Sequence, residues 1–365
     1  MSATSATPEL TALWRERPGP VLEGGRARRH HILGALSDRV RVHRLPLPAG
    51  PGAIDRLQAF AGALLEGLRV AATVRTGALL LFYPDLPCFV PARAVKVPLM
   101  ILWVVAVRLL LTARGRRLVV DVGDVPRWQA LSLNYDLPAP WWLLRMAELV
   151  VFRCADRVTV ASRGMARDLA LDLSLPEARL AVLPNGAPRR LLELGPPVRP
   201  APGPSIRCIY VGSLDPAQDR GVRALCRAFL ARDDPRCELV LIGENGGWID
   251  EEFCSDRIRA FGPIPEDDCV PWIRSSHFAL IPYPVDRYYR IVYPTKLALY
   301  ALSRVPILSS RLPEVVDPIE RHRLGECLEP DRVFGRIDEL VARYRDFAGG
   351  VDLEALTWEA AVTVL

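Results

Sequence analysis

Lysine is scarce in this chain of 365 residues. Lys96 and Lys296 are its lysines, and the other 45 of the 47 Lys and Arg residues are arginines. An ammonium group is a compact point charge, whereas a guanidinium group is a wide planar fork. A lysine in so arginine-rich a sequence therefore indicates a position where a point charge matters.

Other familiar features are absent as well. The eight cysteines are scattered and form no Cys-x-x-Cys pair, which argues against a zinc site or a disulfide framework and predicts buried thiols in a reducing cytoplasm. There is no Asp-x-Asp pair. The longest apolar run, residues 97–111, is broken by Arg108 and is too short to cross a bilayer. Residues 1–7 are polar and lead into no apolar segment, so we expect no signal peptide.

Charge is distributed unevenly along the chain. Residues 1–190 contain 26 Lys and Arg against 15 Asp and Glu, a balance of +11, whereas residues 191–365 contain 21 against 27, a balance of −6. A basic half favours an anionic partner, such as phosphate or the anionic inner face of a membrane. The arginines are dispersed and accompany no nucleic-acid-binding motif, so we expect no nucleic acid partner. A high arginine content without any partner is the alternative.

Short apolar strands alternate with helical patterns on both sides of a stretch with five prolines in residues 196–204, which can continue neither a helix nor a central strand. This alternation predicts an α/β fold with parallel sheets. We predict two doubly wound, Rossmann-like domains, and the binding site in the cleft between them. The predicted divisions are 1–190, a linker over 191–204, 205–345, and a final helix over 346–365 that crosses back to the first domain. The predicted strands are 78–82, 117–122, 157–161, 180–183, 206–211, 238–242, 278–281 and 305–308.

Lys296 lies in the segment Tyr293-Pro-Thr-Lys-Leu-Ala-Leu-Tyr300. Pro294 favours the first turn of a helix, and Lys296 is expected in that same turn. Backbone N–H groups there are unpaired, and the helix dipole is positive. An ammonium group in that place predicts an anion site, most simply for phosphate. An ordinary surface lysine is the alternative.

Several short motifs occur in the order and spacing of a known family. They are Ile209-Tyr-Val-Gly-Ser-Leu214, Asp219-Arg-Gly-Val222, Leu239-Val-Leu-Ile-Gly-Glu244, Phe261-Gly-Pro-Ile-Pro265, Pro294-Thr-Lys296, Arg304-Val-Pro-Ile-Leu308, and in the first half Leu183-Pro-Asn-Gly186 and the pair Gly24-Gly25. Together they resemble GT-B glycosyltransferases, in particular glycosyltransferase family 4 and the xanthan-type glucuronosyltransferases. The resemblance implies the GT-B fold, in which the first domain binds the acceptor and the second binds a nucleotide diphosphate sugar as co-substrate. It also implies that no cofactor and no metal are needed.

The resemblance implies a set of donor-binding residues. Lys296 and Arg220 are expected at the diphosphate, because fixed cations stabilise the charge that develops on a leaving group. Ser213 follows Gly212 where the family often has arginine. Arg290, or Arg287, is a candidate for a sugar carboxylate, with a solvated loop cation as the alternative. The other expected donor contacts are Gly243, Glu244, Asn245, Tyr283, Pro294 and Thr295.

The sequence departs from family 4 at the nucleotide ribose. Many members carry two glutamates eight residues apart, the second of which binds the ribose, and the matching positions here are Ile291 and Leu299. Glu244 and Asn245 follow the strand 238–242 and are expected to replace part of that contact. A plain turn is the alternative reading of these two residues.

On the acceptor side, the resemblance implies a glycine loop at Gly24 and Gly25, and we add His30 as a nearby candidate. Asp121 and Asp124 frame the end of the strand 117–122, where two carboxylates are costly unless one faces the cleft or finds a donor. Asp124 is therefore the candidate general base of an inverting transfer, and it stands with Lys296 as a catalytic candidate. A structural, capping role for Asp124 is the alternative.

These features predict a metal-independent hexosyl- or glucuronosyltransferase. It would move a sugar from a nucleotide diphosphate donor to a hydroxyl acceptor, in the synthesis of a bacterial polysaccharide, a glycolipid or a glycosylated metabolite. We expect a cytoplasmic protein, peripheral at the inner face of the membrane, where a lipid-linked acceptor would lie. Two alternatives stay open: an inactive GT-B subunit that binds a nucleotide sugar or a partner, and a nucleotide-sugar 2-epimerase.

Overall fold

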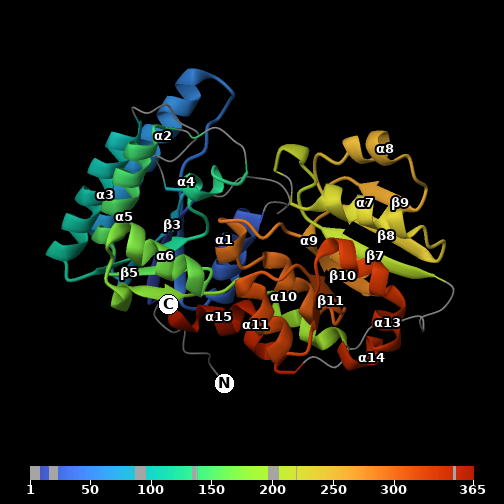
Figure 1. The fold of residues 1–365 in the computed structure, drawn as a ribbon. Coiled ribbons are helices and arrows are strands. Elements are labelled where there is room, and N and C mark those ends of the chain that lie inside the picture. The colour runs from blue at the N-terminus through green and yellow to red at the C-terminus, as the bar shows by residue number, and fades with distance from the viewer. Residues whose placement is uncertain are drawn as a thin grey trace.

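Two parallel sheets organise the chain. The computed structural model describes residues 9–15, 24–86, 96–133, 137, 139–195, 205–218, 220–347 and 351–365. Within these residues the strands form two six-stranded sheets in which all neighbouring strands run parallel. The central strands are rich in Leu, Ile and Val, as expected for strands that helices cover on both faces. Figure 1 shows the two sheets in separate lobes, with helices around each.

The first sheet has the order β2-β1-β3-β4-β5-β6. Four of its strands were predicted from sequence, whereas β1 and β2 were not. The sequence of β2, Val-Arg-Val-His-Arg, is more than half polar, so it lacks a buried-strand pattern. The strands are β1 (Leu10–Trp14), β2 (Val40–Arg44), β3 (Ala78–Tyr83), β4 (Arg117–Val122), β5 (Arg157–Val160) and β6 (Leu180–Val182).

The helices of this first domain cover both faces of its sheet. They are α1 (Gly24–Ala35), α2 (Ala53–Thr73), α3 (Lys96–Ala113), α4 (Pro126–Gln129), α5 (Trp141–Cys154), α6 (Arg163–Leu173), η1 (Glu177–Arg179) and η2 (Arg189–Leu194). Ser162 caps α6, because its side chain accepts a hydrogen bond from the backbone N–H of Met165 at 3.0 Å.

The second sheet has the order β12-β11-β10-β7-β8-β9. Sequence reasoning missed its two edge strands, which are only three or four residues long. The strands are β7 (Ile206–Val211), β8 (Cys237–Ile242), β9 (Ile258–Phe261), β10 (Phe278–Ile281), β11 (Ile307–Ser309) and β12 (Gly325–Cys327). The helices of this second domain are η3 (Pro216–Gln218), α7 (Val222–Arg232), α8 (Trp248–Phe253), α9 (Glu266–Arg274), η4 (Tyr289–Ile291), α10 (Thr295–Leu302), α11 (Pro313–Arg321), α12 (Pro330–Val333), η5 (Phe334–Arg336), α13 (Ile337–Ala342) and α14 (Tyr344–Phe347).

Two details of the predicted boundaries need correction. Residues 191–194 of the expected linker belong to η2, where Leu191 is buried, and residues 196–204 lie outside the described chain. The expected helix over 346–365 is not continuous. Its first two residues end α14, and residues 351–365 form the short helices η6 (Leu353–Leu356), α15 (Trp358–Ala361) and η7 (Val362–Val364). This segment packs on the first domain, where the N–H of Trp358 donates to the carbonyl of Ala187 at 3.1 Å.

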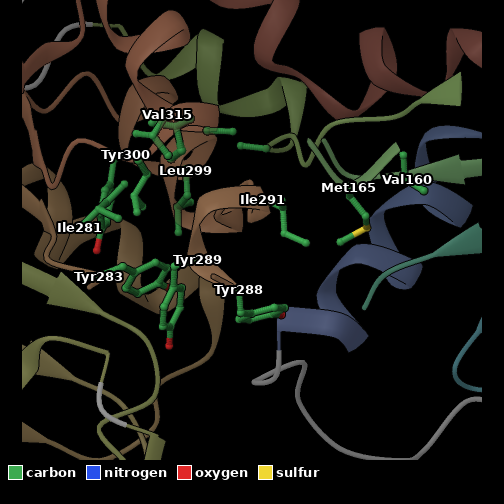
Figure 2. Close-up of a cluster of buried hydrophobic side chains, with 14 of the residues drawn as sticks. Val160, Met165, Ile281, Tyr283, Tyr288, Tyr289, Ile291, Leu299, Tyr300 and Val315 are labelled. Carbon is green, nitrogen blue, oxygen red and sulfur yellow. The ribbon is translucent and has the colours of Figure 1, made fainter. Parts of the chain in front are cut away.

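The two domains share a buried contact. Figure 2 shows Ile291 of η4 and Met165 of α6 pointing toward each other from opposite domains, and both side chains are buried. Glu314 of α11 accepts hydrogen bonds from the backbone N–H groups of Gly164 at 2.7 Å and Arg163 at 3.2 Å. A carboxylate is favoured at this place, because those N–H groups form the free N-terminus of α6. The contact therefore fixes one domain against the other.

A buried ion pair holds the first domain together near the cleft. Arg28 of α1 donates to both carboxylate oxygens of Asp121 on β4, at 2.9 and 2.7 Å, and the two side chains are only 2% and 1% exposed. The same guanidinium donates to the Leu183 carbonyl and the Asn185 side chain at 2.9 Å. Asp121 also accepts from Thr159 at 2.7 Å. Both charges are thus fully hydrogen-bonded, which explains why a carboxylate is tolerated there.

The cysteines are free in the described chain, and Cys88 lies outside it. Five of them are buried, whereas Cys154 is partly exposed and Cys254 is exposed, so the expectation of buried thiols is wrong for Cys254. Of the helices that the structure describes, none has both the length and the apolar character needed to cross a membrane.

We expect Asp121→Ala to lower the free energy of unfolding by about 3–5 kcal/mol, because Arg28 would remain buried without its partner. Asp338→Ala is the matched control. Asp338 pairs with Arg232 and Arg236 but is 59% exposed, so its loss should change stability by about 1 kcal/mol or less. Urea unfolding of both variants measures the difference. Equal effects would show that the buried pair has no special role.

Candidate active site

A cavity of about 290 Å³ lies between the two domains, at the carboxyl ends of their strands. Its walls on the second domain are the loop after β7, Glu244 after β8, and the start of α10. On the first domain they are Gly25 and the loop after β6. Of the predicted donor residues, the cavity is lined by Gly212, Ser213, Arg220, Glu244, Tyr283, Thr295 and Lys296.

Lys296 is buried without a hydrogen-bond partner. The residue is 6% exposed, and its Nζ lies 3.7 Å from the ring centroid of Tyr210 and 4.9 Å from that of Tyr283. No described group accepts a hydrogen bond from Nζ. Burial lowers the pKa of Lys296 well below its usual 10.5, and the nearby charge of Arg220 lowers it further. An anion in the cavity would give the ammonium group its missing partner and favour the protonated form.

The position of Lys296 follows from its helix. It is the second residue of α10, with Pro294 as the N-cap, so Pro294 lies one position earlier than expected. The side chain is directed against the loop after β7. A Cβ atom built on Gly212 would lie 2.5 Å from Lys296 Nζ, and Gly212 has a φ of +151°. Glycine therefore allows the backbone to approach the ammonium group closely.

Asp124 lines a second, adjoining cavity of about 150 Å³. The two cavities share Gly25, Arg220, Tyr283 and Thr295, so the cleft continues from Lys296 to Asp124. Asp124 follows β4, and Pro294 lies in the same wall.

The Asp124 carboxylate is held from the opposite domain. The hydroxyl of Tyr288 donates to Asp124 Oδ1 at 2.7 Å and accepts from the side chain of Gln129 at 3.0 Å. Burial raises the pKa of Asp124 above the ordinary 3.8, although the Tyr288 hydrogen bond and the charges of Arg220 and Arg28 oppose the change. A carboxylate with a raised pKa is better matched to proton abstraction near neutral pH.

The structure places His31, and not the predicted His30, in the wall of the first cavity. His30 is exposed and lines neither cavity, whereas His31 lines the first one. His31 lies one turn after Ala27, which lines the same wall, and neighbours four apart share one helix face. His31 Nε2 is 3.0 Å from Glu266 of the second domain, and its ring stacks on Trp358 with centroids 5.7 Å apart. His30 instead lines a third cavity of about 460 Å³, together with His31 and Glu266.

Other predicted donor contacts are also not brought into these two cavities. Arg290 is exposed on η4 and lines neither, and Arg287 lines a different cavity. Asn245 is an exposed turn residue with a φ of +62°, which matches the plain-turn alternative. Gly24 begins α1, and Gly243 lies in a small pocket of about 60 Å³ beside Glu244.

Some residues of the site were not predicted from sequence. Tyr288, Gln129, Asn185, His31, Glu266 and Trp358 line the two cavities. Their roles depend on contacts between distant segments, and of these residues only Asn185 belongs to a motif noted in the sequence. Leu299, where family 4 has the ribose glutamate, lines the first cavity with an apolar side chain. Among the described residues, no three His, Cys, Asp or Glu side chains are grouped so that they could hold a metal ion.

Solved structures share this architecture over almost the entire chain. Sucrose-phosphate synthase from Thermosynechococcus elongatus has a TM-score of 0.70 and 14% identity, with 98% of this chain and 96% of that chain covered. WaaG, a glycosyltransferase involved in lipopolysaccharide biosynthesis, has a TM-score of 0.62 and 12% identity, with 97% of this chain and 99% of that chain covered. Anabaena HepE in complex with UDP-glucose has a TM-score of 0.59 and 14% identity, with 97% of this chain and 93% of that chain covered. No curated protein matches the chain in sequence.

The chain thus has the GT-B fold of glycosyltransferases, and the predicted fold of two facing Rossmann-like domains is confirmed. Residues 21–186 match the family model of the glycosyl transferase 4-like domain, so the resemblance noted in the sequence is confirmed too. The match lies in the first domain, whereas most of the motifs quoted for the resemblance lie in the second.

We expect Gly212→Ala to weaken the binding of inorganic pyrophosphate about tenfold or more. The added methyl would displace Lys296 Nζ and strain a φ of +151°. Gly335→Ala is the matched control, because a Cβ at Gly335 meets nothing within 4 Å. Titration calorimetry measures both affinities, and unfolding midpoints show whether each variant folds. Wild-type affinity in Gly212→Ala would contradict an anion site at Lys296.

Proposed function

We propose that this protein is a glycosyltransferase that takes a sugar from a nucleoside diphosphate donor. The observation that carries the proposal is Lys296, a buried amine without a hydrogen-bond partner, which lines the inter-domain cavity together with Arg220. Two cations fixed in advance would stabilise the negative charge that develops on a departing diphosphate. The GT-B fold and the UDP-glucose bound to HepE agree with such a donor.

The chemistry proceeds as a direct displacement. A hydroxyl of the acceptor gives its proton to Asp124 as its oxygen forms a bond to the anomeric carbon of the donor sugar. The bond between that carbon and the diphosphate oxygen breaks, and the electron pair leaves with the nucleoside diphosphate next to Lys296 and Arg220. Tyr288 holds the Asp124 carboxylate in place. Displacement from the opposite side inverts the anomeric configuration.

The donor pocket differs from that of many family 4 enzymes where it would hold the ribose. Leu299 and Ile291 offer no carboxylate, and Glu244 is an exposed acidic side chain of the same cavity. We assign Glu244 to the nucleoside end of the donor. Cations of the protein balance the diphosphate charge, so the reaction as proposed needs no metal ion.

The acceptor is proposed to be a lipid-linked hydroxyl compound at the inner face of the cytoplasmic membrane. The +11 charge balance of residues 1–190 supports this location, because anionic lipid attracts basic surfaces. A role in bacterial polysaccharide or glycolipid synthesis follows, with a hexosyl or glucuronosyl group as the transferred sugar.

One experiment separates this function from an inactive subunit that binds nucleotide sugars. The purified protein is mixed with a panel of nucleotide sugars, and its melting temperature and the slow hydrolysis of each donor are measured. A donor that both raises the melting temperature and is hydrolysed supports the transferase. A donor that stabilises the protein without any turnover, also with candidate acceptors present, supports the inactive subunit.

We expect Lys296→Ala to lower donor turnover by about a hundredfold or more, because loss of one fixed donor to a developing charge costs about 2.7–4 kcal/mol. The fold should survive, since the change removes a buried amine that makes no hydrogen bond in the described chain. Lys296→Arg should be impaired as well, because the planar guanidinium does not fit a space shaped for an ammonium group. Lys96→Ala, at the start of α3, is the control and should turn over normally. Normal turnover by Lys296→Ala would remove the phosphate assignment.

Activity should fall on the acid side as Asp124 becomes protonated, since a general base acts in its charged form. The raised pKa places this loss at a higher pH than an ordinary Asp would. Tyr288→Phe removes a hydrogen bond that lowers the pKa, so the acid limb of the kcat/KM profile should move to still higher pH. Tyr344→Phe, far from the cleft, should leave the profile unchanged.

Asp124→Asn should abolish transfer and leave donor affinity intact. Parallel loss of donor binding would mark Asp124 as structural.

A further inference from the structure

Helix α3 is apolar on the side that faces solvent. Its inner side is buried, with Met100, Val104 and Val107 fully covered. On its outer side Leu102 and Leu109 are 66% and 65% exposed, and further apolar residues extend the same stripe. A surface helix normally presents charged or polar residues outward. An apolar outer stripe of this length therefore indicates a surface that something covers.

The neighbouring helices widen this surface. Helix α3 packs between α2 and α5, and the side chain of Trp103 donates to the Leu64 carbonyl at 2.9 Å. Figure 1 shows α2, α3 and α5 together at one end of the molecule, away from the second domain. We call their exposed apolar residues the outer apolar face, which consists of Leu65 of α2, Leu99, Leu102, Val105 and Leu109 of α3, and Trp142 and Met146 of α5.

The exposed charges on α3 and α5, the two helices with most of the outer apolar face, are mostly positive. Helix α3 has no carboxylate, and the one on α5, Glu148, is buried. Two nearby carboxylates are paired with arginines, Glu66 of α2 with Arg69 and Asp172 with Arg145 of α5. The exposed cations Arg114 and Arg153 lie on or directly after α3 and α5. An apolar surface with basic residues at its edge fits an anionic bilayer, which offers both acyl chains and negative headgroups. A second copy of the chain fits less well, because it would bring these cations together.

One end of the outer apolar face reaches the edge of the first domain where the cleft lies. Helices of a parallel α/β domain run antiparallel to its strands, so α3 and α5 begin at the edge where the cleft lies. Trp142 belongs to the first turn of α5. Next to it, Trp141 lines a cavity of about 470 Å³ that reaches Tyr288, the residue that donates to Asp124. A lipid-linked acceptor could thus extend from the membrane toward the base.

We propose that the outer apolar face inserts into the interfacial region of a bilayer that contains anionic lipid. Leu102, Leu109 and Trp142 enter the boundary with the acyl chains, and the arginines meet the headgroups. This docking rests on the proposed membrane location, but not on the proposed catalytic roles of Lys296 and Asp124. Binding is reversible, because insertion is limited to a few side chains and salt screens the arginines.

Flotation with vesicles of phosphatidylcholine, with and without phosphatidylglycerol, tests the proposal. The full-length protein should float with the anionic vesicles and float less at high salt. The double variant Leu102→Glu, Leu109→Glu should bind these vesicles about tenfold or more weakly. It removes apolar side chains that would enter the bilayer, and it adds negative charges that the anionic lipid repels. Leu194→Glu in η2, where the leucine is 48% exposed, is the matched control and should float like the wild type.

Three results would overturn the docking. The double variant could float as well as the wild type, which would leave the arginines alone as the cause. The wild type could bind neutral vesicles as well as it binds anionic vesicles, or it could bind neither kind of vesicle. Sedimentation could show a wild-type dimer that the double variant loses, which would make the face a protein interface. Lys296→Ala should float normally but not turn over donor. A wild type that turns over donor without floating therefore contradicts the docking alone, whereas one that floats without turnover contradicts the catalytic proposal alone.

Discussion

The buried guanidinium of Arg28 connects the parts from which the cleft is built. It bonds Asp121 at the end of β4, and it reaches the loop after β6 through Leu183 and Asn185. Asn185 in turn donates to the carbonyl of Tyr293 at 2.6 Å, directly before the helix that bears Lys296. One side chain thus fixes the floor of the first domain and, through an amide, the position of the second. A lysine could not make these four bonds, because they need the forked geometry of arginine.

The cleft separates two kinds of charge. At one end Lys296 and Arg220 lie among tyrosine rings, and burial holds the pKa of Lys296 low until an anion arrives. At the other end Asp124 is raised in pKa by burial, while Tyr288 limits the change. Because Tyr288 belongs to the second domain and Asp124 to the first, the carboxylate is complete only when the domains meet. The hydrogen bond that holds Asp124 therefore depends on the contact between the two domains.

The two surfaces of the first domain carry different chemistry. The surface toward the second domain carries charged and polar side chains such as Asp124 and Gln129, whereas helices α2, α3 and α5 expose leucine, tryptophan and methionine. The parallel sheet separates these surfaces, yet the first turns of α3 and α5 lie at the edge where the cleft opens. An acceptor with a lipid part and a sugar part would match this division.

The sequence by itself determined most of the fold and singled out Lys296, which the structure places in the inter-domain cavity. Long apolar strands such as β3, β4 and β8 were readable because buried parallel strands have little polar content, and Lys296 was readable because Pro294 marks a helix start. Sequence reasoning did not find the short strands β1, β2, β9 and β12. Neighbouring strands in the sheet stabilise them, and their local sequence pattern does not mark them as strands. Only the tertiary structure decided that His31 and not His30 lines the cavity of Lys296, that Arg290 lines neither this cavity nor the one of Asp124, and that Tyr288 holds Asp124. Those outcomes depend on helix phase and on contacts between residues more than 150 positions apart, which no local pattern encodes.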